Sequence, residues 1–273
     1  MVSRITDSEF DSNRTKEYKL SIQVSPDGFS FSVVHPVKNR ILAFYDEEIK
    51  LSSLHFIGRR FDEWLENHQE ILKKEFAEIN LYYYSGKYTL APSPFYDYKN
   101  QDTLINLLFG NDKACETRDN YIPEVSANLI FTIPLSLIET FQNHYPGIAV
   151  QHPLSGFIAN TFKKENSKNS SAFLFFNRKS FDILLFSEGS LLTVNHFKSV
   201  VAADVAYFLF SVLKSNNINA KDTEMELSGN ITEESETFRI LCQFFKTVRL
   251  KNISVDYNFE TYGKAPYMHT FFY

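Results

Sequence analysis

Alternating apolar and polar residues, interrupted by tight turns, are the feature that most restricts how this chain can fold. Near the start, Leu20, Ile22 and Val24 alternate with polar residues, and a Ser-Pro-Asp-Gly turn leads into a second alternating run at 29–33. A third strand is predicted over 41–47. A period of two residues is typical of half-buried β-strands, and tight turns make successive strands antiparallel neighbours. The sequence therefore predicts a three-stranded antiparallel unit here.

The order βββαβαβ of predicted elements occurs twice, and in the first copy a further helix and a short strand follow it. In the first copy the three strands precede a helix within 54–72, a strand at 79–84, a short helix at 102–109, a strand at 128–133, a helix from 134 and a short strand at 148–151. In the second copy, strands at 172–176, 181–186 and 191–197 precede a helix at 200–214, a strand at 223–227, a helix at 233–245 and a strand at 248–253. Helical crossovers add parallel strands to a sheet. The prediction is a mixed α/β chain of two βββαβαβ halves, each a five-stranded mixed sheet with flanking helices.

These elements divide the chain into three parts. Residues 1–17 are polar and aperiodic, so we expect a flexible N-terminal lead-in. The first half is expected over 18–150, with an irregular exposed connection at 111–123. The second half is expected over 151–273, and it includes a linking helix at 153–164.

Composition and charge exclude several classes of protein. Hydrophobic residues make up 44% of the 273 residues, which is enough for one large core or two smaller ones. The net charge is −5 and the basic clusters are short, so no nucleic-acid partner is expected. The N-terminus has no apolar stretch of the signal-peptide kind, and the longest apolar run, 200–213, contains Asp204. We therefore expect a cytoplasmic protein without a membrane span.

No motif for catalysis or metal binding is present in the sequence. The two cysteines are predicted to be free thiols, with Cys242 buried on an apolar helix face, and the seven histidines have no metal-ligand spacing. We therefore predict no catalytic residue, no metal site and no cofactor. The aromatic C-terminal residues, 262–273, either fold back onto the core of the second half or anchor a partner.

The duplicated order, together with the runs at 20–36 and 172–197, resembles the actin-like ATPase superfamily, whose halves are ribonuclease H-like. The segments 135–149 and 153–162 look like the part that links the halves in bacterial pilus-assembly members. The chain also resembles a bacterial family of uncharacterised proteins with a degenerate version of this fold. The resemblance implies an actin-like ATPase fold over most of the chain, from Tyr18 onward.

The resemblance also implies where a nucleotide would bind. In the superfamily, each half has a hairpin whose Asp organises hydrated Mg²⁺ and whose turn holds phosphates. Here Gln23 and Phe175 occupy the positions of these carboxylates, and no Gly-Gly pair follows in the second half. These departures favour a pseudo-ATPase over an enzyme. The leading hypothesis is a non-catalytic actin-like scaffold or protein-interaction module with an unidentified protein partner.

Two alternatives stay open, as does the oligomeric state. One is a nucleotide-binding protein or ATPase with a rearranged site in the cleft between the halves, built from Asp27, Gly28, Arg178 and Lys179. Each of these also has a structural interpretation, because Asp27 and Gly28 form a turn and Arg178 and Lys179 suit a solvated one. The other is a different α/β enzyme, since fold analogy alone does not establish function.

Overall fold

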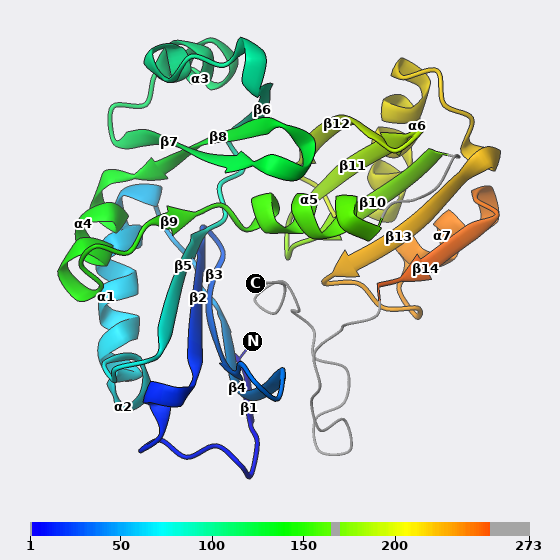
Figure 1. Ribbon diagram of the computed structural model, residues 1–273. Helices are drawn as coiled ribbons and strands as arrows, with labels where there is room; N and C mark the ends of the chain where they lie inside the picture. Colours follow the sequence, from blue (N-terminus) through cyan, green and yellow to red (C-terminus); the bar gives the residue numbers. More distant parts are fainter. Residues whose placement is uncertain (1, 165–169, 252–273) are drawn as a thin grey trace. The chain divides into compact units, whose positions relative to one another are not determined.

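The computed structural model describes residues 2–164 and 170–251, which form two compact units made of residues 2–157 and 158–251 (Figure 1). The division falls after Phe157, inside helix α5 (Pro153–Lys164), whereas the sequence had suggested a division after Val150. Sheets of mixed strand direction with flanking helices make up both units, so the predicted α/β class is confirmed.

The first unit contains a six-stranded sheet in the order β1-β4-β3-β2-β5-β9. Its strands are β1 (Val2–Thr6), β2 (Lys19–Ser25), β3 (Gly28–His35), β4 (Arg40–Glu48), β5 (Glu78–Tyr83) and β9 (Val150–Gln151). The pairs β2–β3 and β3–β4 are antiparallel, as the tight turns predicted, and β5 adds parallel to β2. The first sheet thus has six strands rather than the five expected.

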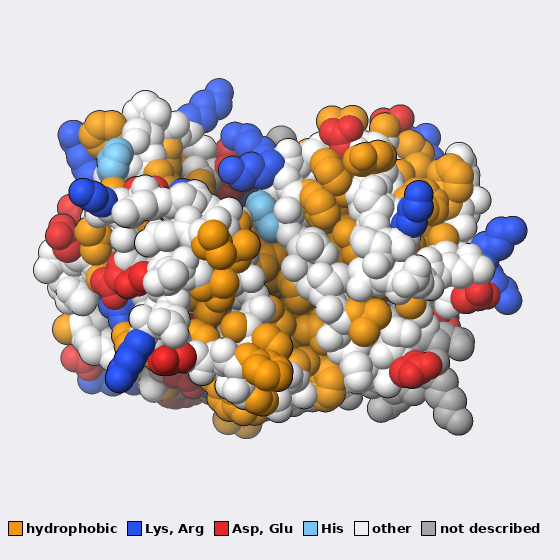
Figure 2. Space-filling model, turned by 90° about the horizontal axis from the view of Figure 1, so that it is seen from above, with side chains coloured by type: hydrophobic (Ala, Val, Ile, Leu, Met, Phe, Trp, Pro, Cys, Tyr) orange, Lys and Arg blue, Asp and Glu red, His pale blue; other side chains and the backbone are white. Residues whose placement is uncertain are grey.

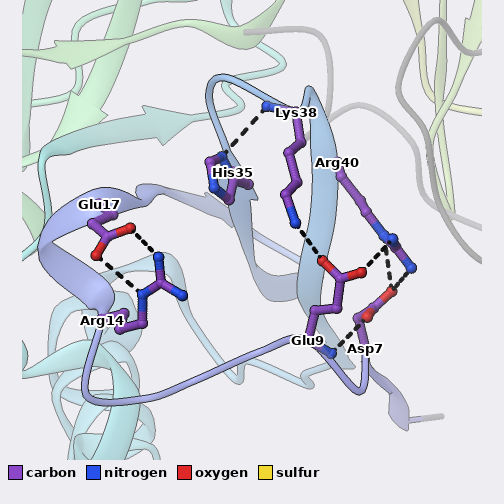
Figure 3. A network of polar contacts seen from close by, with 7 residues as sticks. All are labelled: Asp7, Glu9, Arg14, Glu17, His35, Lys38 and Arg40. Carbon is purple, nitrogen blue, oxygen red and sulfur yellow. Dashed lines mark hydrogen bonds and ion pairs between the residues drawn. The ribbon is translucent and has the colours of Figure 1, made fainter.

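The extra strand comes from the segment expected to be a flexible lead-in. β1 pairs antiparallel with the outer edge of β4, and ion pairs hold the residues that follow it (Figure 3). The Arg40 guanidinium contacts Asp7 at 2.8 Å and Glu9 at 3.0 Å, and Lys38 reaches Glu9 at 2.7 Å. An edge strand needs backbone partners on one side only, so it can form without alternating apolar side chains. That is why periodicity did not reveal it.

Helices α1 (Ile57–Asn67), α2 (Gln69–Leu72) and α4 (Leu135–His144) lie together on one side of this sheet (Figure 1). α1 buries Phe61 and Trp64, whose rings contact Phe29 of β3 at centroid distances of 5.5 and 5.6 Å. α1 and α4 approach closely at Gly58, where an added Cβ would lie 2.2 Å from the carbonyl oxygen of Ser136. Burial of an aromatic ring such as that of Phe61 contributes about 1.5–3 kcal/mol to the stability of the fold.

A separate three-stranded sheet with one helix is inserted between β5 and α4. It consists of β6 (Tyr88–Pro92), α3 (Gln101–Phe109), β7 (Cys115–Ile122) and β8 (Ala127–Pro134), with strand order β6-β8-β7. The strand expected at 128–133 is therefore present but belongs to this sheet. The expected irregular connection at 111–123 is wrong, because most of it is β7. β7 is an edge strand with charged side chains, so it lacks the pattern of a buried strand.

The second unit contains a five-stranded sheet in the order β12-β11-β10-β13-β14, as expected. Its elements are β10 (Ser170–Phe176), β11 (Phe181–Ser187), β12 (Ser190–Phe197), α6 (Ala202–Ser215), β13 (Thr223–Gly229), α7 (Glu236–Phe244) and β14 (Thr247–Leu250). Apolar residues of α6 and α7, such as Leu209 and Leu241, pack with Leu174 and Ile183 of the sheet. This core covers one face of the second sheet.

Short 3-10 helices connect several of these elements: η1 (Thr15–Glu17), η2 (Leu54–Phe56), η3 (Ser93–Phe95), η4 (Tyr98–Asn100), η5 (Pro123–Val125) and η6 (Ala220–Asp222).

Candidate functional site

Each half presents a hairpin at the end of its central strand, where the candidate nucleotide contacts were predicted. β2 turns into β3 through Pro26 and Asp27, and β10 turns into β11 through residues 177–180. The parallel neighbours β5 and β13 end beside these hairpins. In open α/β sheets, ligands bind at the carboxyl ends of parallel strands. The two hairpins are therefore the first candidates for a site.

In the first hairpin, Gln23 stands at the position that the resemblance assigns to an aspartate. It lies opposite Ser30 of β3 and beside Tyr82 of β5, and its side chain is buried. Its carbonyl oxygen Oε1 has no hydrogen-bond partner among the residues that the structure describes. A neutral amide supplies a much weaker field for Mg²⁺ than a carboxylate does.

Asp27 and Gly28 serve the turn itself. The hydroxyl Oγ of Ser25 lies 2.7 Å from Oδ1 of Asp27 and 3.0 Å from the carbonyl oxygen of Gly28. The backbone carbonyl of Asp27 accepts a hydrogen bond from Ile49 at 3.0 Å. Gly28 is the first residue of β3 and pairs with Ser25 across the hairpin. These contacts agree with the turn-forming interpretation of both residues.

In the second hairpin, Phe175 stands at the position that the resemblance assigns to the second aspartate, and it is buried between β11 and β13. Asp182 lies directly opposite Phe175 on β11 and is fully buried. Nδ1 of His196 contacts Oδ1 of Asp182 at 2.9 Å. A buried carboxylate needs such a partner because desolvation of an unpaired charge costs several kcal/mol. The hairpin thus has a carboxylate, but one already bonded to a neighbouring strand.

Sequence reasoning missed the Asp182–His196 pair. The sequence feature that could have indicated it is the single charged residue within the apolar run Phe-Asp-Ile-Leu-Leu-Phe. In the turn itself, Arg178 is half-buried and Lys179 is exposed. The turn is closed by a hydrogen bond of 2.8 Å from the amide of Asn177 to the carbonyl of Ser180. An exposed Lys179 fits the expected solvated turn.

The end of β13 carries a second feature that the sequence did not reveal. Gly229 has a φ of +86°, and a Cβ added there would lie 2.1 Å from the carbonyl oxygen of Phe176. The amide of Asn230 donates to that same carbonyl at 2.8 Å. Only glycine allows this close approach. Its signal was a lone glycine that ends the run Glu-Leu-Ser-Gly.

Metal and thiol chemistry find little support. Among the described residues, no group of three or more His, Cys, Asp or Glu side chains could hold a metal ion. Burial and the neighbouring Asp112 raise the pKa of the Cys115 thiol to about 11, which disfavours the thiolate. Cys242 is exposed on α7, so the expectation that it is buried is wrong. It lies just beside the buried face of that short helix, which Leu241 occupies.

The buried side chain of His152 is hydrogen-bonded to the backbone of neighbouring segments. It is fully buried, and its Nε2 lies 2.9 Å from the carbonyl oxygen and 3.1 Å from the amide nitrogen of Ser85. The amide of Leu154 donates to its Nδ1 at 3.2 Å, and the amide of His152 itself donates to Asn120 at 2.7 Å. His152 therefore joins the segment just after β5, β7 and the start of α5, which is a structural role.

The inserted sheet and its helix expose apolar side chains, unlike the hairpins. We call four of them the α3 surface: Phe95, Tyr98, Leu107 and Leu108, which are 87%, 66%, 81% and 51% exposed. Beside α3, a cavity of about 300 Å³ is lined by residues that include Ile105 and Leu135. Figure 2 shows hydrophobic patches among charged side chains on its left-hand part, where α3 and β6–β8 lie in Figure 1. Large apolar side chains left exposed on one small part of a molecule are typical of protein-binding surfaces.

Comparison with known proteins places these features in a family. A family model described as a protein of unknown function, DUF3822, matches residues 7–248. A crystal structure from Bacteroides thetaiotaomicron VPI-5482, described as a protein with actin-like ATPase fold and unknown function, superposes with a TM-score of 0.81. That match has 21% identity and covers 93% of this chain and 97% of the other.

A more distant structure is the PilM-PilN type IV pilus biogenesis complex. It matches with a TM-score of 0.58 and 8% identity, over 94% of this chain and 97% of the other. No curated protein sequence matches the chain. No helix in the described part of the chain is long and apolar enough to cross a membrane. The chain thus has the actin-like ATPase fold, as the resemblance implied, and it is similar to a pilus-assembly member of that superfamily.

Proposed function

Because the chain belongs to the DUF3822 family, whose function is unknown, we propose its role from its own residues: a cytoplasmic, non-catalytic actin-like scaffold that binds a protein partner. The observation that carries this proposal is the pair of hairpin positions, where Gln23 and Phe175 stand in place of metal-organising carboxylates.

The remaining carboxylates near the hairpins support the same conclusion. Mg²⁺ is bound in proteins through carboxylates and substrate phosphates. Asp27 accepts a hydrogen bond inside its own turn, and Asp182 is bonded to His196 in a buried pair. Recruiting either one for a metal would break an existing contact. The nucleotide chemistry of the superfamily therefore has no ready anchor in either hairpin.

The α3 surface supports the second part of the proposal. α3 buries only Gln101 and Ile105, yet three of its nine residues are leucines. Exposure of Leu107 and Leu108 to water is unfavourable, and their burial by a partner would stabilise the complex. The structural neighbour is named as a complex of PilM with PilN. That precedent agrees with a binding role for the fold.

Nucleotide binding is tested by titrating ATP with Mg²⁺ into the purified protein, followed by calorimetry. The proposal expects no binding at millimolar ATP. Saturable, Mg²⁺-dependent binding that is lost in Asp27→Ala and in Arg178→Ala would instead support the second candidate, a nucleotide-binding protein with a rearranged site. Binding that persists in both variants would refute the assignment of these residues and the non-catalytic proposal together.

Partner binding is tested by affinity capture from the native cell extract, with and without ATP. The double variant Leu107→Ser, Leu108→Ser should lose a partner that the unmodified protein retains, irrespective of ATP. Tyr207→Ser is the matched control, because Tyr207 is 68% exposed on α6 of the second unit. Equal loss in the control variant would mean that the α3 surface is not the binding site.

A further inference from the structure

Each of the three sheets ends in strands that have a neighbour on one side only, and most of these edge strands carry a feature that discourages further pairing. In the described part of the chain the edge strands are β1, β9, β6, β7, β12 and β14. β1 and β14 each contain an arginine, β7 contains Glu116, Arg118 and Asp119, β6 ends in Pro92, and β9 has only two residues. Charge, proline and short length are common ways in which proteins protect an edge strand.

The edge strand β12 has neither charge, nor proline, nor short length to protect it. Its eight residues include no Lys, Arg, Asp, Glu or Pro, and it is the last strand of the second sheet on the side beyond β11 (Figure 1). The register with β11 passes over Leu192, which forms a β-bulge near the start of the strand and is 44% exposed. A bulge disrupts pairing locally. The part of β12 that suits a further strand is therefore its regular part, Thr193–Phe197, which we call the β12 edge.

The charge of the β12 edge favours a second copy of the same strand as its partner. An unprotected edge strand is a template for another strand. Like charges directly opposite each other destabilise a strand pair, so a charged strand would repel its own copy. The β12 edge consists of Thr, Val, Asn, His and Phe, and the ring of its histidine, His196, already contacts the carboxylate of Asp182 at 2.9 Å. Self-pairing therefore brings no like charges together.

The middle residue of the β12 edge, Asn195, suits a position on a twofold axis. When two identical strands pair antiparallel about such an axis, the register that uses all five residues places Asn195 opposite its own copy. Its Oδ1 accepts a hydrogen bond from Oγ1 of Thr193 at 3.0 Å, and its Nδ2 has no hydrogen-bond partner among the residues that the structure describes. A side-chain amide has two donor hydrogens and a second acceptor lone pair. Two such amides that face each other can therefore each donate to the other.

We propose that two copies of this protein pair antiparallel through the β12 edge, with Asn195 on the twofold axis. The pairing joins the five-stranded sheets of the two copies into one continuous sheet. The contact between the strands is about 17 Å long, so the interface is small and the dimer belongs to the weak, reversible class. The proposal is independent of the scaffold function, because it concerns a second copy of the chain and a strand of the second unit, whereas the α3 surface belongs to the first.

A disulfide experiment tests the register of this pairing. In a protein with Cys115→Ser and Cys242→Ser, Asn195→Cys should form an intermolecular disulfide under mild oxidation, because the Cα atoms of directly opposite residues lie about 4.5–5.5 Å apart. Thr193→Cys is the matched control: it lies on the same face of the same strand, but the proposed register separates it from its own copy by four residues, or about 14 Å. The disulfide at position 195 should therefore form at least about tenfold faster. Non-reducing electrophoresis of samples taken over time measures both rates.

Sedimentation equilibrium of the full chain tests whether the dimer exists without a crosslink. The unmodified protein should show a monomer–dimer equilibrium. Asn195→Asp should raise the dissociation constant at least about tenfold at neutral pH, because two carboxylates would then face each other across the axis. Asn111→Asp is the control, since it makes the same change of charge at an exposed position of the first unit and should leave the dissociation constant unchanged.

Three results would overturn the proposal. Equal rates of disulfide formation at positions 193 and 195 would contradict the register about Asn195. A dissociation constant that Asn195→Asp and Asn111→Asp change equally would mean that two copies meet at another surface. A chain that sediments as a monomer up to millimolar concentration would show that the β12 edge does not pair with its own copy, and would leave it for a strand of a different protein.

Discussion

The two sheets of this protein share an order of strands but differ in their outer faces. In both, the face toward the long helices is apolar, as with Phe29 and Phe31 in the first and Leu174 and Ile183 in the second. The outer face of the second sheet carries Phe173, Leu184 and Phe186 beside the Asp182–His196 pair and the polar side chains of β13, whereas that of the first is rich in serine. The fold therefore depends on the helix-facing sides, and the outer faces are free to change their chemistry.

The largest expected effect belongs to the second half, where β13 ends against β10. Gly229→Ala should reduce the free energy of unfolding by about 3–4 kcal/mol, because a Cβ would meet the Phe176 carbonyl at 2.1 Å at a φ of +86°. Gly189→Ala is the control, since its φ is +74° but the space around it is open; it should cost about 1 kcal/mol. Guanidinium unfolding measures both. Equal losses in the free energy of unfolding would show that the close approach at Gly229 adds nothing to the cost of the substitution.

The second prediction compares variants on the outer faces of the two sheets. Asp182→Ala should destabilise the protein by about 3 kcal/mol, because it leaves His196 without its buried carboxylate. Ser30→Ala, on the serine-rich outer face of the first sheet, should cost no more than about 0.5–1 kcal/mol, the net contribution of a single neutral polar group. Urea unfolding of both variants makes the comparison. A larger loss for Ser30→Ala would mean that the serine-rich face contributes more to stability than the Asp182–His196 hydrogen bond does.

The reactivity of the Cys115 thiol provides a test of the inserted sheet. Its pKa of about 11 lies two units above the ordinary 9.0, so at pH 8 its thiolate fraction is about 100-fold below that of a free thiol. Iodoacetamide labelling, followed by peptide mass spectrometry, should be slower by that factor and should rise tenfold per pH unit until about pH 11. Asp112→Asn should lower the pKa and speed the labelling. A rate equal to that of a small free thiol would contradict the predicted burial.

Periodicity predicted the elements that bury an apolar face and missed those that do not. The strands of the second half and helices such as α6 follow from alternating or helical spacing, and all were expected near their observed positions. β1 and β7 were not predicted, because backbone hydrogen bonds hold these edge strands and their side chains do not alternate between apolar and polar. The exposed side of α7 misled the interpretation of Cys242, because a nine-residue helix buries only a narrow stripe.

The candidate site could be located from the sequence only as far as its turns. Gln23 and Phe175 were placed correctly as strand residues at the hairpins, and Asp27 as a turn former. The pairing of Asp182 with His196 depends on the register between β11 and β12. The need for glycine at position 229 depends on how closely β13 approaches β10. Both are tertiary facts that no local pattern encodes.

The smallest expected effect compares the same hairpin position in the two halves. Gln23→Met keeps the length of the side chain and removes a buried carbonyl that has no partner in the described part of the chain, so it should stabilise the protein by about 1 kcal/mol. Phe175→Leu, at the matching position of β10, should destabilise it by about 1 kcal/mol through lost packing. Thermal unfolding of both variants measures the difference. If Gln23→Met instead costs more than the Phe175 variant, the amide of Gln23 contributes to stability, and the assumption that its carbonyl is an unsatisfied group is wrong.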